Sequence, residues 1–180
     1  MTLITGICGS PRRGGNSELA LKEILNRCKQ LGAQIDLILL SEKKILTCNG
    51  CLRCEDDNTC PIDDDSSEVF NTLIRSDIII FSTPSYFDNM TGILKNFIDR
   101  TNLITGQLKG KKAAIIIVGQ ADETSWIAAS QTLETYCKIV GIDVIGKAYG
   151  KARKIGDISG NQEFKKQLSN LISIIKPFID

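Results

Sequence analysis

The stretch LITGICGSPRRGGNSELALKEILNRCKQL, residues 3–31, contains the three parts of a strand–loop–helix unit. A short apolar run occupies residues 3–8 and ends at Gly9. Residues 17–31 follow in a helical pattern, because their apolar side chains recur every three or four positions. That stripe consists of Ala20, Ile24, Cys28 and Leu31. The segment therefore predicts a buried strand, a loop rich in glycine, serine and arginine, and a helix.

The same alternation runs through the rest of the chain. Apolar runs that predict strands stand at residues 35–40, 77–82, 113–118 and 143–147. Helical patterns stand at residues 67–75, 92–100, 125–140 and 161–178, while residues 41–65 are loop-like. Strands joined through helices must run parallel, with right-handed crossovers. The sequence therefore predicts an α/β fold: a three-layer, doubly wound, five-stranded parallel sheet of flavodoxin type, with strand order 2-1-3-4-5.

Length and composition narrow the function classes. The chain has 180 residues, a net charge of +1 and no histidine. One domain over residues 1–180 is expected, with a cysteine-rich loop at residues 47–61. The charge balance gives no reason to expect nucleic acid or a membrane surface as partner, and histidine bases and histidine-ligated metals are excluded. A cytoplasmic location is expected, because no signal peptide pattern and no apolar run of ~18 residues is present.

The loop after the first strand suits a terminal phosphate. It reads GSPRRGGNSELA, residues 9–20, and leads into the N-terminus of a helix, where free N–H groups attract anions. Its side-chain donors are Ser10, Asn16 and Ser17, and its cations are Arg12 and Arg13. The spacing matches neither a Walker A loop nor GxGxxG. The alternative is a plain helix start with Ser17 as its cap and two solvated arginines.

The loop after the third strand has the residues that a flat aromatic ligand needs. It reads TPSYFDNMTGILKNFIDR, residues 83–100. Pro84, Tyr86 and Phe87 can form apolar walls, and the backbone of residues 85–87 can donate to ring atoms. Gly119 and Gln120, after the fourth strand, stand where a further loop would close over the same ligand. The alternative for the aromatic residues is core packing beside a strand end.

Four cysteines stand in CNGCLRCEDDNTCP, residues 48–61, with the spacing C-x2-C-x2-C-x5-C. Tight cysteine runs followed by another cysteine and a proline are typical of iron–sulfur ligation. The predicted ligands are Cys48, Cys51, Cys54 and Cys60. Zinc and cluster-free thiols remain open, whereas disulfides are disfavoured in a cytosolic protein.

The remaining cysteines and the nearby acidic residues receive simpler interpretations. Cys8, Cys28 and Cys137 are predicted to be core residues. Residues 55–57 are expected to form a solvated acidic rim, and residues 63–65 are expected to be charges at a helix N-terminus.

Two of these stretches together resemble a known family. GSPRRGGNS and TPSYFDNMTGILKNFIDR are similar to the phosphate loop and the flavin-contacting segment of the NADPH-dependent FMN reductase-like flavoproteins, and the cysteine spacing resembles their iron–sulfur flavoprotein branch. The resemblance implies bound FMN, one [4Fe–4S] cluster and a homodimer or homotetramer. By that resemblance the FMN phosphate is held by Ser10, Arg12, Asn16 and Ser17. The isoalloxazine ring is surrounded by Pro84, Ser85, Tyr86, Phe87 and Gly119. The family often has glycine where this chain has Asp88.

The sequence thus favours an electron-transfer flavoprotein. Electrons would pass between a partner such as ferredoxin, or NAD(P)H, and a small-molecule acceptor through the cluster and FMN, with no side-chain acid or base required. One alternative is a cluster-free NAD(P)H-dependent FMN or quinone reductase. Another is a non-catalytic redox-sensing module whose cysteines hold zinc or switch by oxidation.

Overall fold

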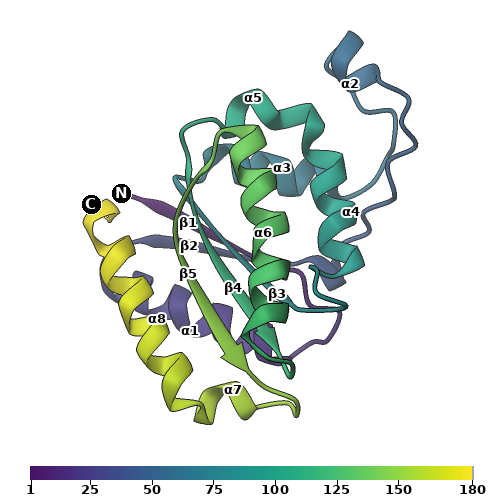
Figure 1. Ribbon diagram of the computed structural model, residues 1–180. Coiled ribbons are helices and arrows are strands. Elements are labelled where there is room, and N and C mark those ends of the chain that lie inside the picture. Colours follow the sequence, from purple (N-terminus) through teal and green to yellow (C-terminus); the bar gives the residue numbers. More distant parts are fainter. Residues whose placement is uncertain (180) are drawn as a thin grey trace.

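A computed structural model describes residues 1–179 of the chain. These residues form a five-stranded parallel sheet in the order β2-β1-β3-β4-β5, which confirms the predicted fold. The strands, shown in Figure 1, are β1 (Leu3–Cys8), β2 (Gln34–Leu39), β3 (Ile78–Pro84), β4 (Lys112–Gly119) and β5 (Asp143–Lys151). The long helices are α1 (Asn16–Gln30), α3 (Ser66–Arg75), α4 (Gly92–Arg100), α6 (Glu123–Val140) and α8 (Gln162–Ile175).

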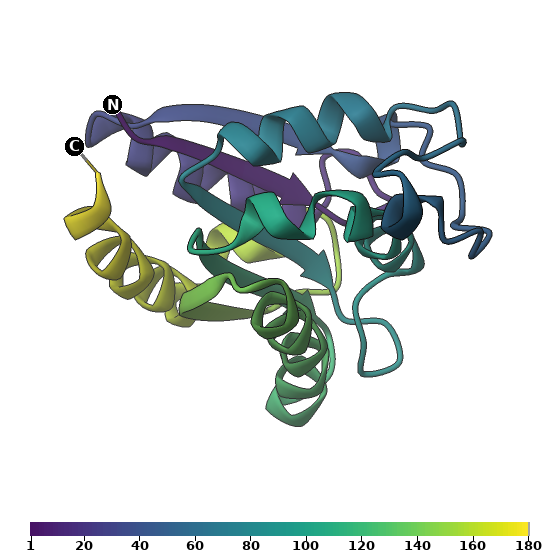
Figure 2. The same ribbon diagram turned by 90° about the horizontal axis from the view of Figure 1, so that it is seen from above.

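The sheet lies between two layers of helices. Helices α1 and α8 cover one face, and α3, α4 and α6 cover the other, as Figures 1 and 2 show. The inner strands β1, β3 and β4 are buried on both faces because their residues are almost continuously apolar. Two apolar clusters, one on each face of the sheet, form the core.

Three cysteines belong to this core, as predicted. Cys8 and Cys28 are buried in the cluster beneath α1 and α8, and Cys137 is buried in the cluster beneath α6. Burial raises the pKa of Cys8 and Cys28 to about 11 and that of Cys137 to about 12. These thiols therefore stay protonated at neutral pH and are poor nucleophiles.

The last strand is longer than predicted. The apolar pattern ends at residue 147, but β5 continues to Lys151 and pairs with β4 along its length. Gly150 conceals this continuation, because a glycine adds no apolar side chain to the pattern. It is needed there for close packing: a Cβ at Gly150 would lie 2.3 Å from Ile158 and 3.0 Å from Phe164. Close packing, which apolar periodicity does not register, thus extends the strand.

Several short helices also escape the pattern. Helices α2 (Arg53–Asp56), α5 (Thr105–Leu108) and α7 (Asp157–Gly160) have one turn each, and α8 ends at Ile175, where a 3₁₀ turn continues to Phe178. One-turn helices are too short to show a periodicity. None of the helices in the described part of the chain combines the length and apolarity that a membrane crossing needs.

The cysteine loop is fastened to the fold by a buried ion pair. Arg100, at the end of α4, contacts Asp64 with a nitrogen–oxygen distance of 2.6 Å, and both side chains are at most 1% exposed. Sequence reasoning assigned Asp64 to a helix N-terminus together with Asp63 and Asp65. It does accept the Ser66 N–H at the start of α3, but its main partner is Arg100, which only the tertiary fold brings near.

Removing this buried charge is expected to destabilise the fold. Burial by itself would raise the pKa of Asp64, but hydrogen bonds from Arg100 and Ser66 hold it well below its ordinary value. Asp64→Asn leaves the Arg100 cation unpaired and should lower the free energy of unfolding by about 3–5 kcal/mol in urea at neutral pH. The exposed neighbour gives a control, Asp63→Asn, whose effect should stay within about 0.5 kcal/mol.

The difference between the wild type and Asp64→Asn should also depend on pH. A carboxyl whose pKa is depressed by folding stabilises the native state above its unfolded pKa of about 3.9 and loses that contribution as pH falls further. The difference should therefore persist from pH 7 to about pH 4 and shrink below. Equal stability of the two asparagine variants at neutral pH would contradict this account.

Candidate functional site

The loops that follow β1, β3, β4 and β5 enclose a cavity of about 330 Å³ at the carboxyl edge of the sheet. This is the edge at which open parallel sheets bind ligands. Every residue predicted to hold FMN lines it: Ser10, Arg12, Asn16, Ser17, Pro84, Ser85, Tyr86, Phe87 and Gly119. Gln120 also lines it, together with Val118 and three residues after β5. The volume lies within the usual range for small-molecule sites.

The loop that follows β1 is held by a buried carboxylate. Helix α1 begins at Asn16 with Gly15 as its N-cap, so Ser17 lies inside the first turn and is not the cap. Glu18 accepts the Gly14 N–H at 2.6 Å and the Lys22 ammonium at 2.6 Å. Burial would raise the pKa of Glu18, but these donors keep it below its ordinary value. Glu18 therefore fixes the loop as an ionised group and leaves the N-terminus of α1 at the cavity.

The two arginines of the loop have different surroundings. Arg13 pairs at the surface with Glu42, with a nitrogen–oxygen distance of 2.6 Å, and does not line the cavity. Arg12 lines the cavity, and its backbone N–H donates to the Ser10 hydroxyl at 3.1 Å. Arg12 is thus placed to neutralise an anion in the cavity, whereas the charge of Arg13 is already compensated.

Asn16 holds a neighbouring loop in the wall of the cavity. Its side-chain amide donates to the Lys154 carbonyl at 2.8 Å, and its side-chain oxygen accepts the Gly156 N–H at 3.0 Å. These bonds tie the loop after β5 to the phosphate loop. Sequence reasoning missed the residues that this loop contributes, Ala152, Arg153 and Ile155, because it ended β5 too early. The rule that ligands bind at the carboxyl ends of parallel strands, applied to the true end of β5, would have identified these residues.

A strained turn presents the aromatic residues. Tyr86 and Asn89 exchange backbone hydrogen bonds of 2.9 and 3.1 Å, and the residues between them have positive φ angles of 51° at Phe87 and 58° at Asp88. This is a type I′ turn, which favours glycine or asparagine. Asp88 tolerates the conformation that glycine adopts more freely. Phe87 is strained and fully exposed (104%), which marks the turn as a functional element.

Gly119 is required by close packing beside the loop that follows β3. A Cβ at this position would lie 2.9 Å from the indole Nε1 of Trp126. Within residues 1–179 this buried Nε1 has no hydrogen-bond partner. Trp126 is the single tryptophan of the sequence, so its fluorescence reports on this part of the cavity wall. A buried donor next to a residue of the cavity wall suits a ligand that has hydrogen-bond acceptors at its edge.

The four predicted ligands line a second cavity, of about 390 Å³. It is formed by the cysteine loop, the end of α4, the 3₁₀ turn Thr101–Ile104 and the end of α6. Cys48 and Cys51 are exposed, while Cys54 and Cys60 are half-buried. Nevertheless, in the described part of the chain no three cysteine, aspartate or glutamate side chains lie close enough to share a metal ion. The acidic residues 55–57 are exposed, as predicted.

Comparison with known proteins identifies the family. The model of the family "NADPH-dependent FMN reductase" matches residues 2–154. The chain belongs to this family. An iron-sulfur flavoprotein from Methanosarcina thermophila is 33% identical over 146 residues, which cover 79% of this chain and 76% of that protein. The predicted resemblance is thereby confirmed.

Two further comparisons agree with this family. A putative NAD(P)H-dependent FMN-containing oxidoreductase of Bacillus subtilis is 26% identical over 179 residues, covering 94% of this chain and 96% of that one. The apo structure of an NADH:FMN oxidoreductase superposes with a TM-score of 0.78 at 21% identity, covering 100% of this chain and 91% of that one, and so shares its fold. The chain is therefore a flavin-dependent oxidoreductase, and its family supports FMN as the cofactor.

The contrast between the two arginines generates a prediction about phosphate recognition. Arg12→Ala should weaken FMN binding about tenfold, because one hydrogen-bonded charge contact is removed. Riboflavin, which lacks the phosphate, should bind the variant as it binds the wild type. Arg13→Ala is the matched control and should change neither affinity more than twofold. Titration with quenching of Trp126 fluorescence measures all of these affinities, and equal losses for both arginine variants would contradict the assignment.

Proposed function

We propose that this FMN reductase carries a [4Fe–4S] cluster and passes electrons between a ferredoxin-like partner, or NAD(P)H, and a small-molecule acceptor. The observation that supports this most directly is that the two sets of predicted residues line two separate cavities. Those chosen for FMN line one cavity, and the cysteines chosen for the cluster line the other. When bound, the cluster exchanges single electrons and FMN supplies two-electron chemistry.

The protein's own residues would position FMN by charge and shape. Arg12, Ser10 and the N-terminus of α1 would bind the phosphate. Tyr86, Phe87 and Gly119 would contact the ring. The hydroxyl of Ser85 hydrogen-bonds that of Ser125 at 2.9 Å and so fixes the β3 loop against α6. The loop after β5, held by Asn16, would exclude water from the remaining side.

The cysteine cavity fits a cluster in the kind and number of its donors. All four thiols are free and stand on one loop, and Gly50 has the positive φ angle, 68°, of a tight turn. Their present separation means that ligation must draw the loop together, which its exposed upper part permits. Cys48, Cys51, Cys54 and Cys60 would hold the iron atoms as thiolates.

The two cavities lie at opposite ends of α6. Ser125, in its first turn, borders the FMN side, whereas Tyr136 and Ile139 line the cysteine cavity. Eleven residues of helix span about 16 Å. A homodimer or homotetramer would shorten the path if the cysteine cavity of one copy faced the FMN cavity of another. The exposed Ile139 and Phe87, on the two sides, are apolar residues that such a contact would cover.

A second candidate function is a cluster-free NAD(P)H-dependent FMN reductase. The open arrangement of the four cysteines in the described residues favours it. The family of the chain supports either flavin enzyme over a non-catalytic redox sensor.

The deciding experiment is a visible spectrum of anaerobically purified protein, with iron and FMN quantified in the same sample. Flavin bands with a broad shoulder and about four irons per chain support the proposal. Flavin bands without iron, even after cluster reconstitution, together with rapid bleaching by NAD(P)H, would favour the second candidate.

A single substitution tests the ligand assignment. Cys51→Ala should abolish the cluster, because three thiolates cannot complete a four-cysteine site, and should leave one FMN per chain. Cys28→Ala, which removes a core thiol instead, should retain both groups. Iron content is the measurement, and normal iron in Cys51→Ala would show that this ligand is wrongly assigned.

A further inference from the structure

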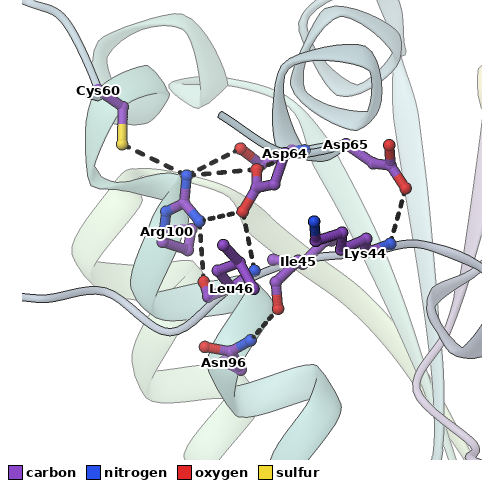
Figure 3. A network of polar contacts seen from close by, with 9 residues as sticks. Lys44, Ile45, Leu46, Cys60, Asp64, Asp65, Asn96 and Arg100 are labelled. Carbon is purple, nitrogen blue, oxygen red and sulfur yellow. Dashed lines mark hydrogen bonds and ion pairs between the residues drawn. The ribbon is translucent and has the colours of Figure 1, made fainter. Parts of the chain in front are cut away.

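Arg100 lies between the segment that leads into the cysteine loop and the segment that leads out of it (Figure 3). It donates to the Leu46 carbonyl at 2.8 Å and to the Ser66 hydroxyl at 3.0 Å. Its partner Asp64 accepts the Leu46 N–H at 2.8 Å. The guanidinium and the carboxylate therefore join residue 46, before the loop, to residues 64–66, after it.

The same guanidinium reaches one of the predicted ligands. Its Nη2 lies 3.3 Å from the sulfur of Cys60 and is a hydrogen-bond donor to it. Asn102, in the 3₁₀ turn that follows α4, makes a second contact of this kind. Its amide nitrogen lies 3.2 Å from the sulfur of Cys54. Two donors that stand outside the cysteine loop are thus directed at two of its sulfurs.

The two donors have different chemistry. Arginine presents a planar fork of five N–H groups, so Arg100 can bond Asp64, Leu46, Ser66 and Cys60 at once, whereas a lysine has only three N–H groups to donate. Burial by itself would lower the pKa of Arg100, but the hydrogen bonds with Asp64 and Cys60 raise it above its ordinary value. Asn102 is neutral and exposed, and besides Cys54 it contacts Glu55 at 3.4 Å. The contact of Arg100 with Cys60 therefore belongs to a buried network, whereas that of Asn102 with Cys54 lies at the surface.

We infer that Arg100 and Asn102 are positioning residues that hold the thiolates of Cys60 and Cys54 and raise the reduction potential of the cluster bound there. This inference rests on the proposed function. Reduction adds one electron, from the partner or from reduced FMN, and increases the negative charge on the ligand sulfurs. Hydrogen bonds donated to those sulfurs therefore stabilise the reduced form more than the oxidised form.

Arg100 also holds the two ends of the cysteine loop together before a cluster binds. With Leu46 and residues 64–66 already joined, Cys60 is fixed before any metal arrives. Cys48 and Cys51 stand on the exposed part and can move toward it. Arg100 thereby defines where the cluster is assembled, and the potential of that cluster reports the contact.

The experiment compares three variants of the full chain after anaerobic reconstitution. Asn102→Ala is an exposed change that preserves the fold, and Arg100→Lys keeps the buried charge but loses the fork. Asn96→Ala is the matched control, because Asn96 lies on the same helix and donates to the Ile45 carbonyl at 2.6 Å but not to a sulfur. Iron content is measured first, and the cluster is then titrated with dithionite under electron paramagnetic resonance.

At the potential where the wild-type cluster is half reduced, the ratio of reduced to oxidised cluster should fall about tenfold in Asn102→Ala, as expected for loss of one hydrogen bond to a charged group. That ratio corresponds to about 59 mV for a one-electron couple. Arg100→Lys should lower the ratio at least as much in the fraction that retains iron. Asn96→Ala should leave it unchanged.

The outcomes separate this inference from the proposal beneath it. A wild-type protein without iron overturns the proposed function and this inference with it. A wild-type protein with about four irons, whose reduced-to-oxidised ratio is the same in Asn102→Ala and Arg100→Lys, overturns the inference alone. Loss of iron in Arg100→Lys with no change in the ratio shows that Arg100 is merely structural.

Discussion

Parallel strand pairing is the constraint on which the rest of this structure depends. Strands that point the same way bring the loops after β1, β3, β4 and β5 to one edge of the sheet. The loop after β1, an aromatic turn and Gly119, which are far apart in the sequence, thereby line one cavity. The cysteine loop rests instead on the helices of one face, at the C-terminal ends of α4 and α6. The two cavities are thus separated along the length of α6.

The two ends of the cysteine loop are fixed, whereas its middle is exposed. Its ends are joined through the buried pair of Arg100 and Asp64, while Cys48 and Cys51 remain exposed. A long segment with little secondary structure is costly to order, because each ordered backbone residue loses about 1–2 kcal/mol of conformational entropy. Joining the two ends of the loop limits that cost to the exposed segment between them.

Periodicity predicted most of the fold, because each long helix and each inner strand buries a continuous apolar face. It failed where packing, not pattern, decides. Gly150 hides the end of β5, because it is a glycine that leaves room for the side chains of Ile158 and Phe164. Asn16, predicted to hold the FMN phosphate, lines the cavity, and its side-chain amide bonds the loop after β5, which the pattern could not indicate. Asp64 was assigned to a helix end because its partner, Arg100, lies 36 residues away.

The central claim is that one chain holds FMN at the strand ends and iron at the cysteine loop. Diffraction at the iron absorption edge from crystals of anaerobically purified protein tests it most directly. The account predicts a compact anomalous peak from four irons within the cavity lined by Cys48, Cys51, Cys54 and Cys60, and flavin density beside Arg12. A single tetrahedral metal ion at the cysteines, or flavin density with no anomalous peak there, would contradict it.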